Sequence, residues 1–259
     1  MSTSLVENDK PLKLEIVEHR PAGSGPFPLL IINHGSTGSG ANKNQFGATF
    51  APASVTDYFT AKGWMVIYPQ RRGRGRSEGT YDEGFNKSRT HYSCDPKESL
   101  TGLERAIEDL DAVMAFIATR EYVQQDAILI SGVSRGGVLA IAYAGHRPAA
   151  FVAAINFSGG WLGKKCAQTY QQVNRLAFTR AAVFTGPSLW LYGRNDAYYG
   201  IRHCRDNFDS YCAAGGQGRF LALTASHDLL FKPQIWRTHL DEFLGSLESG
   251  VTKIHNSNT

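Results

Sequence analysis

Residues 127–145 read AILISGVSRGGVLAIAYAG, in which an apolar run, a glycine-rich turn and a second apolar run follow one another. The turn at 132–136, GVSRG, has the pattern G-x-S-x-G. Where this pattern joins a strand to a helix, the serine hydroxyl stands on a sharp turn, and the glycines let the two backbones approach closely. The stretch therefore predicts that Ser134 is a nucleophile. The alternative is a turn with a structural or phosphate-binding role, although the residues match neither G-x-G-x-x-G nor a P-loop.

The rest of the chain alternates between strand and helix patterns. Short apolar runs predict buried strands, and residues 14–19 alternate apolar and polar side chains as an edge strand does. The expected strands are 14–19, 29–33, 64–68, 127–131, 151–157, 188–192 and 219–223. The expected helices are 101–120, with Thr101 and Glu104 as a capping box, a helix starting just after Ser134, 200–212 and 233–247. This alternation predicts an α/β fold with a mostly parallel central sheet, helices on both faces and ligands at the carboxyl ends of the strands.

The length of 259 residues and the hydrophobic content of 42% suit a single domain over residues 1–259. Residues 159–187 are long for one crossover, and we expect them to form a helix and a small cap-like insertion over the strand ends. Residues 1–10 and 254–259 are expected to be polar tails. No apolar run has the length of a membrane span.

The net charge of +4 is mild and points to no particular partner. The densest basic cluster, RRGRGR at 71–76, is interleaved with glycine, so we interpret it as a loop fixed by local hydrogen bonds rather than a nucleic-acid patch. We therefore expect neither nucleic acid nor a membrane as a partner, while the oligomeric state is left open.

The four cysteines, Cys94, Cys166, Cys204 and Cys212, contain no CxxC pair, so no zinc site is expected. The polar N-terminus lacks a signal-peptide core and predicts a cytoplasmic protein, with a mature secreted form as the alternative. In the cytoplasm four free thiols are expected. Cys94 and Cys166 lie in predicted loops and could pair, whereas Cys204 and Cys212 would lie about 12 Å apart on one helix, too far for a disulfide.

A serine hydroxyl needs a base to become nucleophilic, and His227 is the histidine that the pattern places best. It follows the last expected strand, in LALTASHDLLF at 221–231. Asp196 follows the strand at 188–192 and is expected to hold the tautomer of the imidazole, with a turn or helix cap as its alternative role. Asp228 is adjacent to the histidine and therefore badly placed to bond its own neighbour's ring.

A tetrahedral intermediate also needs two preorganised N–H donors for its oxyanion. The turn after the strand supplies the backbone N–H of Arg135. The loop after the strand at 29–33 reads HGSTGSG and is expected to supply the backbone N–H of Ser36. The same small residues could instead form a plain tight turn or cradle a phosphate.

Together these segments resemble the α/β-hydrolase superfamily, and within it the dienelactone-hydrolase-like and prolyl-oligopeptidase-related esterases. The resemblance rests on NHGS at 33–36, YPQRRGRGRSEG at 68–79, GVSRGG at 132–137, YGRND at 192–196 and SHD at 226–228. It extends from about residue 12 to residue 247 and implies a hydrolase with a covalent acyl-serine intermediate and no cofactor. Two departures narrow the expectation: dienelactone hydrolases have a cysteine where Ser134 stands, and the chain has no room for the N-terminal propeller of the peptidases.

We therefore expect a serine hydrolase that cleaves a small-molecule carboxylic ester without a metal. The enzymatic alternatives are thioester hydrolysis, acyl transfer and peptide or amide hydrolysis on the same triad, and the non-enzymatic alternative is a ligand receptor on a hydrolase scaffold. The candidate pocket residues are His34, Arg71, Trp161, Tyr198 and Tyr199. Core packing is the competing role for the aromatic residues. An arginine of the 71–76 cluster could bond a substrate carboxylate or phosphate, or it could have a structural role and bond loop carbonyls or Glu78.

Overall fold

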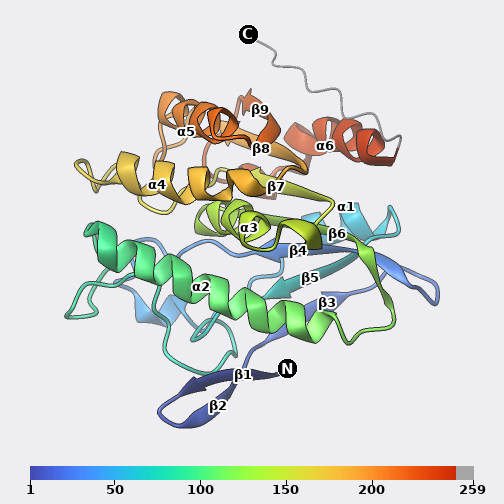
Figure 1. Cartoon of the computed structure of the whole chain (residues 1–259), viewed down its shortest axis with the longest axis horizontal. Helices are drawn as coiled ribbons and strands as arrows, with labels where there is room; N and C mark the ends of the chain where they lie inside the picture. The colour runs from blue at the N-terminus through green and yellow to red at the C-terminus, as the bar shows by residue number, and fades with distance from the viewer. Residues whose placement is uncertain (249–259) are drawn as a thin grey trace.

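A computed structural model describes residues 1–248 of the protein (Figure 1). Its centre is a seven-stranded sheet in the order β3-β5-β4-β6-β7-β8-β9. The edge strand β3 is antiparallel to β5, and the other pairings are parallel. The strands are β3 (Ile16–His19), β4 (Phe27–Asn33), β5 (Met65–Pro69), β6 (Val123–Val133), β7 (Ala153–Phe157), β8 (Pro187–Gly193) and β9 (Gln217–Leu223). The predicted α/β class and each predicted strand are confirmed.

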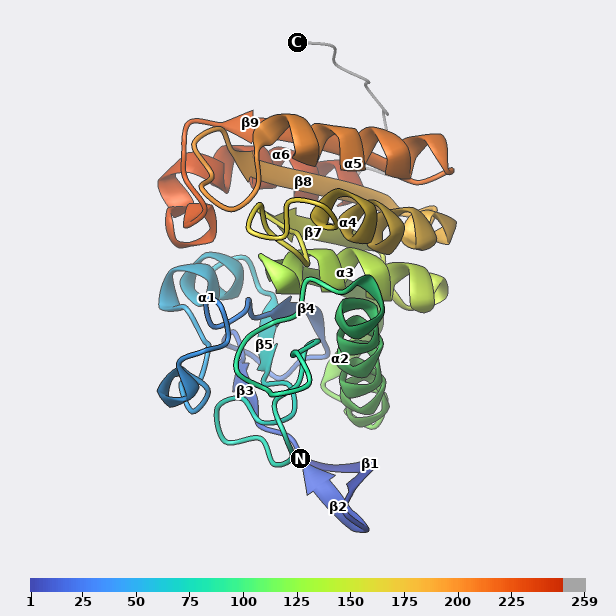
Figure 2. The same ribbon diagram turned by 90° about the vertical axis from the view of Figure 1, so that its left-hand side faces the viewer.

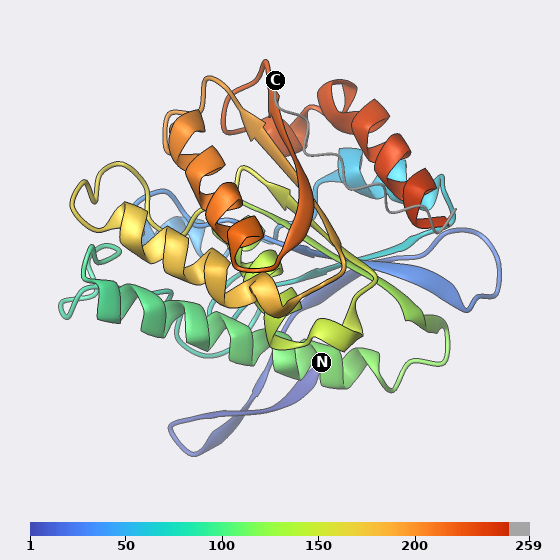
Figure 3. The same ribbon diagram turned by 45° about the horizontal axis from the view of Figure 1, so that its top comes forward.

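Two hydrophobic layers enclose this sheet because its central strands are apolar on both sides. In β4, Leu29 and Ile31 point into one layer, while Leu30 and Ile32 point into the other. Helices α2 (Pro96–Ile117), α3 (Arg135–His146), α4 (Tyr170–Thr179) and α5 (Ile201–Ala213) cover the first face. Helices α1 (Ala53–Thr60) and α6 (Pro233–Glu248) lie together on the opposite face (Figure 3).

Short 3-10 turns complete the connections: η1 (Lys43–Gln45), η2 (Pro148–Ala150), η3 (Arg180–Val183) and η4 (Leu229–Phe231). The segment 159–187, expected to be a cap-like insertion, consists of a loop, α4 and η3. Helix α4 packs beside α3 and α5 in the layer that covers the sheet. The part of this segment that directly follows the carboxyl end of β7 is the loop at 158–169. Within residues 1–248, no helix is long and apolar enough to cross a membrane.

The predicted start of one helix and one of the predicted polar tails were wrong. Helix α2 begins at Pro96 instead of residue 101, and the side chain of Asp95 accepts the backbone N–H of Glu98 at 3.0 Å as its N-cap. The expected tail at 1–10 belongs to an antiparallel hairpin, β1 (Ser2–Glu7) and β2 (Lys10–Lys13), which lies apart from the main sheet (Figure 2). The other expected tail, 254–259, lies outside the described residues.

The expectation of four free thiols was also wrong. Cys94 and Cys166 form a disulfide with their Cα atoms 5.2 Å apart, a normal separation for this bond. The bridge ties the residue before the N-cap of α2 to the loop at 158–169. Cys204 and Cys212 are free and share α5, as predicted.

Candidate active site

Ser134 lies at the junction of β6 and α3 in a backbone conformation that L-residues rarely adopt, with φ +57° and ψ −123°. The glycines beside it are sterically required. A Cβ on Gly132 would lie 2.2 Å from the carbonyl oxygen of Gly136, and a Cβ on Gly136 would lie 2.1 Å from the carbonyl oxygen of Asn33. The predicted turn therefore presents Ser134 at the carboxyl end of a central strand, the arrangement of a nucleophile elbow.

His227 and Asp196 come together because β8 and β9 are parallel neighbours whose following loops meet at the same sheet edge. Nδ1 of His227 lies 2.7 Å from Oδ2 of Asp196. The Asp196 side chain is fully buried, whereas the imidazole is 23% exposed. The other carboxylate oxygen, Oδ1, accepts the backbone N–H groups of Tyr198 and Tyr199 at 2.7 and 3.0 Å. The carboxylate is thus fixed by its own loop and oriented to receive the Nδ1 proton, which leaves Nε2 as an acceptor.

Two predicted pocket residues, Tyr198 and Tyr199, pack against the imidazole of His227, with ring centroids 4.6 and 5.5 Å away. Tyr198 is 51% exposed, but Tyr199 is buried and donates its hydroxyl to the carbonyl of Gly160 at 2.6 Å. Burial raises the pKa of Tyr199, which keeps this hydroxyl protonated as a donor. Since the N–H of Gly160 donates to the carbonyl of Ser134 at 3.2 Å, Tyr199 connects the loop that holds Asp196 to the elbow.

The loop after β4 passes directly beside the elbow, where a Cβ on Gly35 would lie 3.1 Å from the Cβ of Ser134. The predicted oxyanion donor, the N–H of Ser36, belongs to the same planar peptide as the Gly35 carbonyl. That carbonyl oxygen lies 2.8 Å from Nδ1 of His34 and accepts Nη1 of Arg74 at 3.2 Å. In a trans peptide the C=O and N–H point in opposite directions, so fixing the carbonyl also fixes the direction of the Ser36 N–H.

The second predicted donor, the N–H of Arg135, is held in the same way. Its peptide partner is the carbonyl of Ser134, which accepts the N–H groups of Gly137 and Gly160 at 2.9 and 3.2 Å. Arg135 is also the first residue of α3, and the first N–H groups of a helix have no acceptor within the helix and carry its positive dipole end. Both predicted donors therefore adjoin Ser134.

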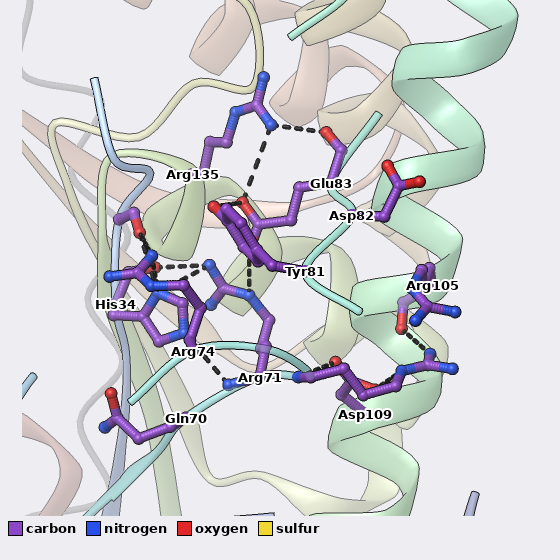
Figure 4. A network of polar contacts seen from close by, with 12 residues as sticks. His34, Gln70, Arg71, Arg74, Tyr81, Asp82, Glu83, Arg105, Asp109 and Arg135 are labelled. Atoms are coloured by element: carbon purple, nitrogen blue, oxygen red, sulfur yellow. Dashed lines mark hydrogen bonds and ion pairs between the residues drawn. The ribbon is translucent and has the colours of Figure 1, made fainter. Parts of the chain in front are cut away.

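The other predicted pocket residues, His34, Arg71 and Trp161, are buried and bonded within the protein. Nε2 of His34 accepts the backbone N–H of Arg71 at 3.2 Å (Figure 4). Burial, together with Arg71 and Arg74, holds the pKa of His34 well below its ordinary value, so this histidine is neutral. The indole N–H of Trp161 donates to the carbonyl of Ser99 at 2.7 Å. These three side chains line the interior behind the elbow and the Ser36 loop.

The arginine cluster divides between the interior and the surface. Arg72 is buried and pairs with Asp109 and with Glu108, while Arg76 is exposed. The cluster is a loop fixed by its own contacts, as interpreted from the sequence: Arg71 pairs with Glu83 in the same loop between β5 and α2, whereas the carboxylate partners of Arg72 lie on α2. Within the described part of the chain, no group of three His, Cys, Asp or Glu residues is arranged to hold a metal ion.

Comparisons with known proteins bear on the family and the fold. The model of a family described as "Serine aminopeptidase, S33" matches residues 50–186, which is more than half of the chain. A search of curated proteins gave no match. Solved structures with a similar fold include three enzymes.

The first is Est1E from Butyrivibrio proteoclasticus with ferulic acid bound, which has a TM-score of 0.63 and 16% identity over 94% of this chain and 99% of that one. The second is the acetyl xylan esterase from Paenibacillus sp. R4, with a TM-score of 0.64 and 16% identity over 92% and 79%. The third is the acylaminoacyl peptidase of Pyrococcus horikoshii, with a TM-score of 0.65 and 14% identity over 100% of this chain but only 42% of that one. The chain belongs to the S33 serine aminopeptidase family and is a serine hydrolase with the α/β-hydrolase fold.

Proposed function

We propose that this protein hydrolyses small carboxylic esters through an acyl-serine intermediate, with Ser134 as nucleophile, His227 as base and Asp196 as the carboxylate that orients the base. The observation that carries the proposal is the 2.7 Å bond between His227 and the fully buried Asp196, in loops that follow strands of the same sheet edge as the Ser134 elbow. A serine alone is a poor nucleophile, and a base held in one tautomer is what activates it.

In the reaction, Nε2 of His227 takes the Ser134 proton while Oγ attacks the ester carbonyl. The negative charge that develops on the carbonyl oxygen is stabilised by the N–H groups of Ser36 and Arg135. The protonated histidine then donates to the leaving alcohol. Water, activated by the same histidine, releases the acid and restores the free serine.

The charges near the site favour an ester over the free N-terminus of a peptide. The side chains behind the Ser36 loop include three guanidinium groups, Arg71, Arg74 and Arg135, against the carboxylate of Glu83, which pairs with two of them. A substrate ammonium group would be repelled there. Two of the similar structures support the same choice: Est1E, which has ferulic acid bound, and the acetyl xylan esterase. The family description, serine aminopeptidase, makes peptide hydrolysis the second function to be tested.

The proposal is tested with a panel of aryl and alkyl esters of increasing acyl length, together with a thioester, an amino-acid anilide and an alcohol acceptor. We expect the esters to be hydrolysed fastest and Ser134→Ala to lose turnover while it keeps its circular dichroism spectrum. A fluorophosphonate probe should label Ser134. Undiminished ester hydrolysis by Ser134→Ala would disprove the assignment, and a folded wild-type protein that neither turns over nor takes the label would indicate a receptor.

We further propose that the exposed ring of Tyr198, beside His227, lines the entrance for the substrate. Tyr198→Ala should then change KM differently for short and long acyl chains, because it removes apolar surface next to the reacting centre. An equal effect on all substrates would argue against this role.

The Cys94–Cys166 disulfide supports an oxidising compartment rather than the cytoplasm expected from the N-terminal sequence. Thiol alkylation of protein taken from its native cells under acid quench provides the test. Four alkylated cysteines would support the cytoplasm, and two would support the oxidising compartment.

A further inference from the structure

We propose that Glu83 is a positioning residue that sets the spacing of the two oxyanion donors. Glu83 lies in the loop between β5 and α2, which contributes no group to the triad. It connects to both ends of residues 34–37, the Ser36 segment, and to Arg135, whose backbone N–H is the other donor. The inference rests on the proposed function, because it assigns a role in holding the oxyanion at Ser134.

The first connection runs through Arg71 to the start of the Ser36 segment. Nε of Arg71 donates to Oε1 of Glu83 at 2.6 Å, and Nη2 of Arg71 donates to the carbonyl of His34 at 2.9 Å (Figure 4). The two paired side chains are only 2% and 3% exposed. Little solvent competes for these groups, so the pair holds one geometry firmly.

The second connection runs through two tyrosine hydroxyls to the other end of the same segment. Tyr81 donates to Oε2 of Glu83 at 2.9 Å, and its oxygen lies 2.6 Å from the hydroxyl of Tyr92. The Tyr92 oxygen accepts the backbone N–H of Thr37 at 3.2 Å. The backbone N–H of Thr37 can only donate, and the carboxylate of Glu83 can only accept. Each hydrogen bond of this chain therefore donates toward Glu83: Thr37 to Tyr92, Tyr92 to Tyr81, and Tyr81 to Glu83. Ser36 therefore lies between two backbone groups that are connected to one carboxylate, the His34 carbonyl through Arg71 and the Thr37 N–H through the two tyrosines.

The third connection is to Arg135. Its Nη1 donates to the backbone carbonyl of Glu83 at 2.6 Å and lies 3.7 Å from Oε2. The Arg135 guanidinium also lies over the rings of Tyr92 and Trp161, 3.7 and 4.7 Å from their centroids, and its Nε donates to the Trp161 carbonyl at 3.0 Å. The side chain of the elbow arginine is thus immobilised against Glu83 while its backbone N–H stays at the head of α3.

Glu83 can act as a fixed reference point because its backbone is pressed against α2. A Cβ on Gly102 of α2 would lie 2.1 Å from the carbonyl carbon of Glu83. Gly84 has φ +84°, and a Cβ there would lie 2.8 Å from the carbonyl of Glu98. A shift of Glu83 would have to move a 22-residue helix. The positions of both oxyanion donors, the N–H groups of Ser36 and Arg135, are therefore fixed relative to α2 through Glu83.

The test replaces Glu83 with glutamine and measures kcat and KM for p-nitrophenyl acetate, together with the inhibition constant of an aryl boronic acid, which forms a tetrahedral adduct on a catalytic serine. Removing a whole oxyanion donor costs about 10²- to 10³-fold in kcat, and a misplaced donor should cost about 10- to 100-fold. We expect kcat and boronate affinity to fall by the same factor while KM stays within twofold. An inhibition constant does not depend on how much of the protein is folded, so a merely structural role would not change it.

The matched control is Asp109→Asn. Asp109 is as buried as Glu83 and pairs with Arg72, but it lies outside the contacts to the Ser36 segment. It should lose stability without a comparable loss of kcat or boronate affinity. Equal kinetic losses in Glu83→Gln and Asp109→Asn, or unchanged kinetics in a folded Glu83→Gln, would overturn the inference.

A gentler pair of variants covers the case in which Glu83→Gln does not fold. Tyr81→Phe breaks the hydroxyl chain and keeps the ring, and Tyr143→Phe removes another buried hydroxyl that donates to a carboxylate, that of Asp111, on the outer side of α2 and α3. Only Tyr81→Phe, which removes both hydrogen bonds of the Tyr81 hydroxyl, should lower kcat and boronate affinity, by about three- to tenfold, the net worth of roughly one hydrogen bond. Equal kinetics in the two variants would overturn the inference.

Ser134→Ala distinguishes failure of the positioning role of Glu83 from failure of the proposed function. If Ser134→Ala is inactive and Glu83→Gln is fully active, the positioning role is wrong and the proposed function stands. If Ser134→Ala hydrolyses the ester like the wild type, both are wrong.

Discussion

Asp196→Asn separates the two tasks of the Asp196 carboxylate. Oδ2 receives the Nδ1 proton of His227 at 2.7 Å, and Oδ1 accepts the backbone N–H groups of Tyr198 and Tyr199 at 2.7 and 3.0 Å. Asparagine keeps one acceptor oxygen and replaces the other by an NH2 donor. It has almost the same shape as aspartate, but it can perform only one of these tasks.

The backbone donors decide which task survives. If the amide turned its NH2 toward Tyr198 and Tyr199, donors would face donors and two hydrogen bonds of about 1 kcal/mol each would be lost. The oxygen therefore stays with the backbone, and the NH2 donates to Nδ1 of His227. The imidazole proton then resides on Nε2, which can no longer accept the proton of Ser134.

We expect Asp196→Asn to lower kcat for p-nitrophenyl acetate by about 10⁴-fold, as a wrong tautomer does in such a triad. This loss corresponds to about 5.4 kcal/mol of transition-state stabilisation. The melting temperature should fall by less than about 4 °C, because the two backbone bonds and the packing remain.

The matched control is Asp228→Asn, next to the histidine in sequence. Its carboxylate accepts from Ser226 and pairs with Lys232 instead of bonding the imidazole. It should keep kcat within about threefold of the wild type, as surface ion pairs contribute little. A loss of less than tenfold in Asp196→Asn, or an equal loss in both variants, would refute the reasoning.

Three further predictions concern the fold around the site. Gly136→Ala should destabilise the protein by about 3 kcal/mol in urea unfolding and abolish turnover, since its Cβ would lie 2.1 Å from the Asn33 carbonyl oxygen; wild-type stability would contradict this. Reducing Cys94–Cys166 should lower the free energy of unfolding by about 4 kcal/mol, because the bridge closes a loop over a sequence separation of 72; a change below about 1 kcal/mol would contradict the chain-entropy account. Burial lowers the pKa of His203 to about 4, so the native state holds this histidine neutral while the unfolded chain takes up a proton near pH 6.5. The free energy of unfolding therefore falls as the pH falls from 6.5 toward 4. After allowance for solvent screening, His203→Gln should reduce the fall in unfolding free energy between pH 7 and pH 4.5 by about 2 kcal/mol, and identical pH profiles would exclude this role.

The fold and the elbow could be predicted because their causes are local in the sequence. The backbones at 132 and 136 come too close for any side chain, so the glycines that the geometry requires are visible as letters around Ser134. Parallel strands buried on both faces need unbroken apolar runs, which are equally visible. His227 and Asp196 could be located because each follows such a run and parallel strands end at one edge.

The start of α2 shows where local reasoning fails. Asp95-Pro96 and Thr101 with Glu104 are both acceptable helix starts, and the apolar stripe that begins at Leu103 favoured the later one. The structure uses Asp95, whose side chain accepts the backbone N–H of Glu98 and which is followed by Pro96 in the first turn. The first buried positions of the helix are Ser99 and Gly102, which add nothing to an apolar stripe and so leave no periodic signal.

The same limit applies to Glu83, which stands in the unremarkable polar sequence YDEGF at 81–85. Only the folded chain shows that it is 2% exposed and faces Arg71 and Arg135. No spacing rule connects these positions: Arg71 lies 12 residues before Glu83 in the same loop, and Arg135 is the first residue of α3. The sequence interpretation of the arginine cluster as a self-bonded loop was correct in kind, but the carboxylate it named, Glu78, accepts the backbone N–H of Lys13, and Arg71 pairs with Glu83.

Buried arginines and oriented amides at this site are two results of one constraint. A buried guanidinium carries five N–H donors that need acceptors, and one carboxylate cannot supply them for Arg71, Arg74 and Arg135. Backbone carbonyls supply several of the others, among them the Gly35 carbonyl, which accepts from Arg74 at 3.2 Å. Turning that carbonyl toward the arginine leaves the N–H of the same peptide, that of Ser36, on the opposite side. The charge that the fold buries therefore helps to determine where the oxyanion donor points.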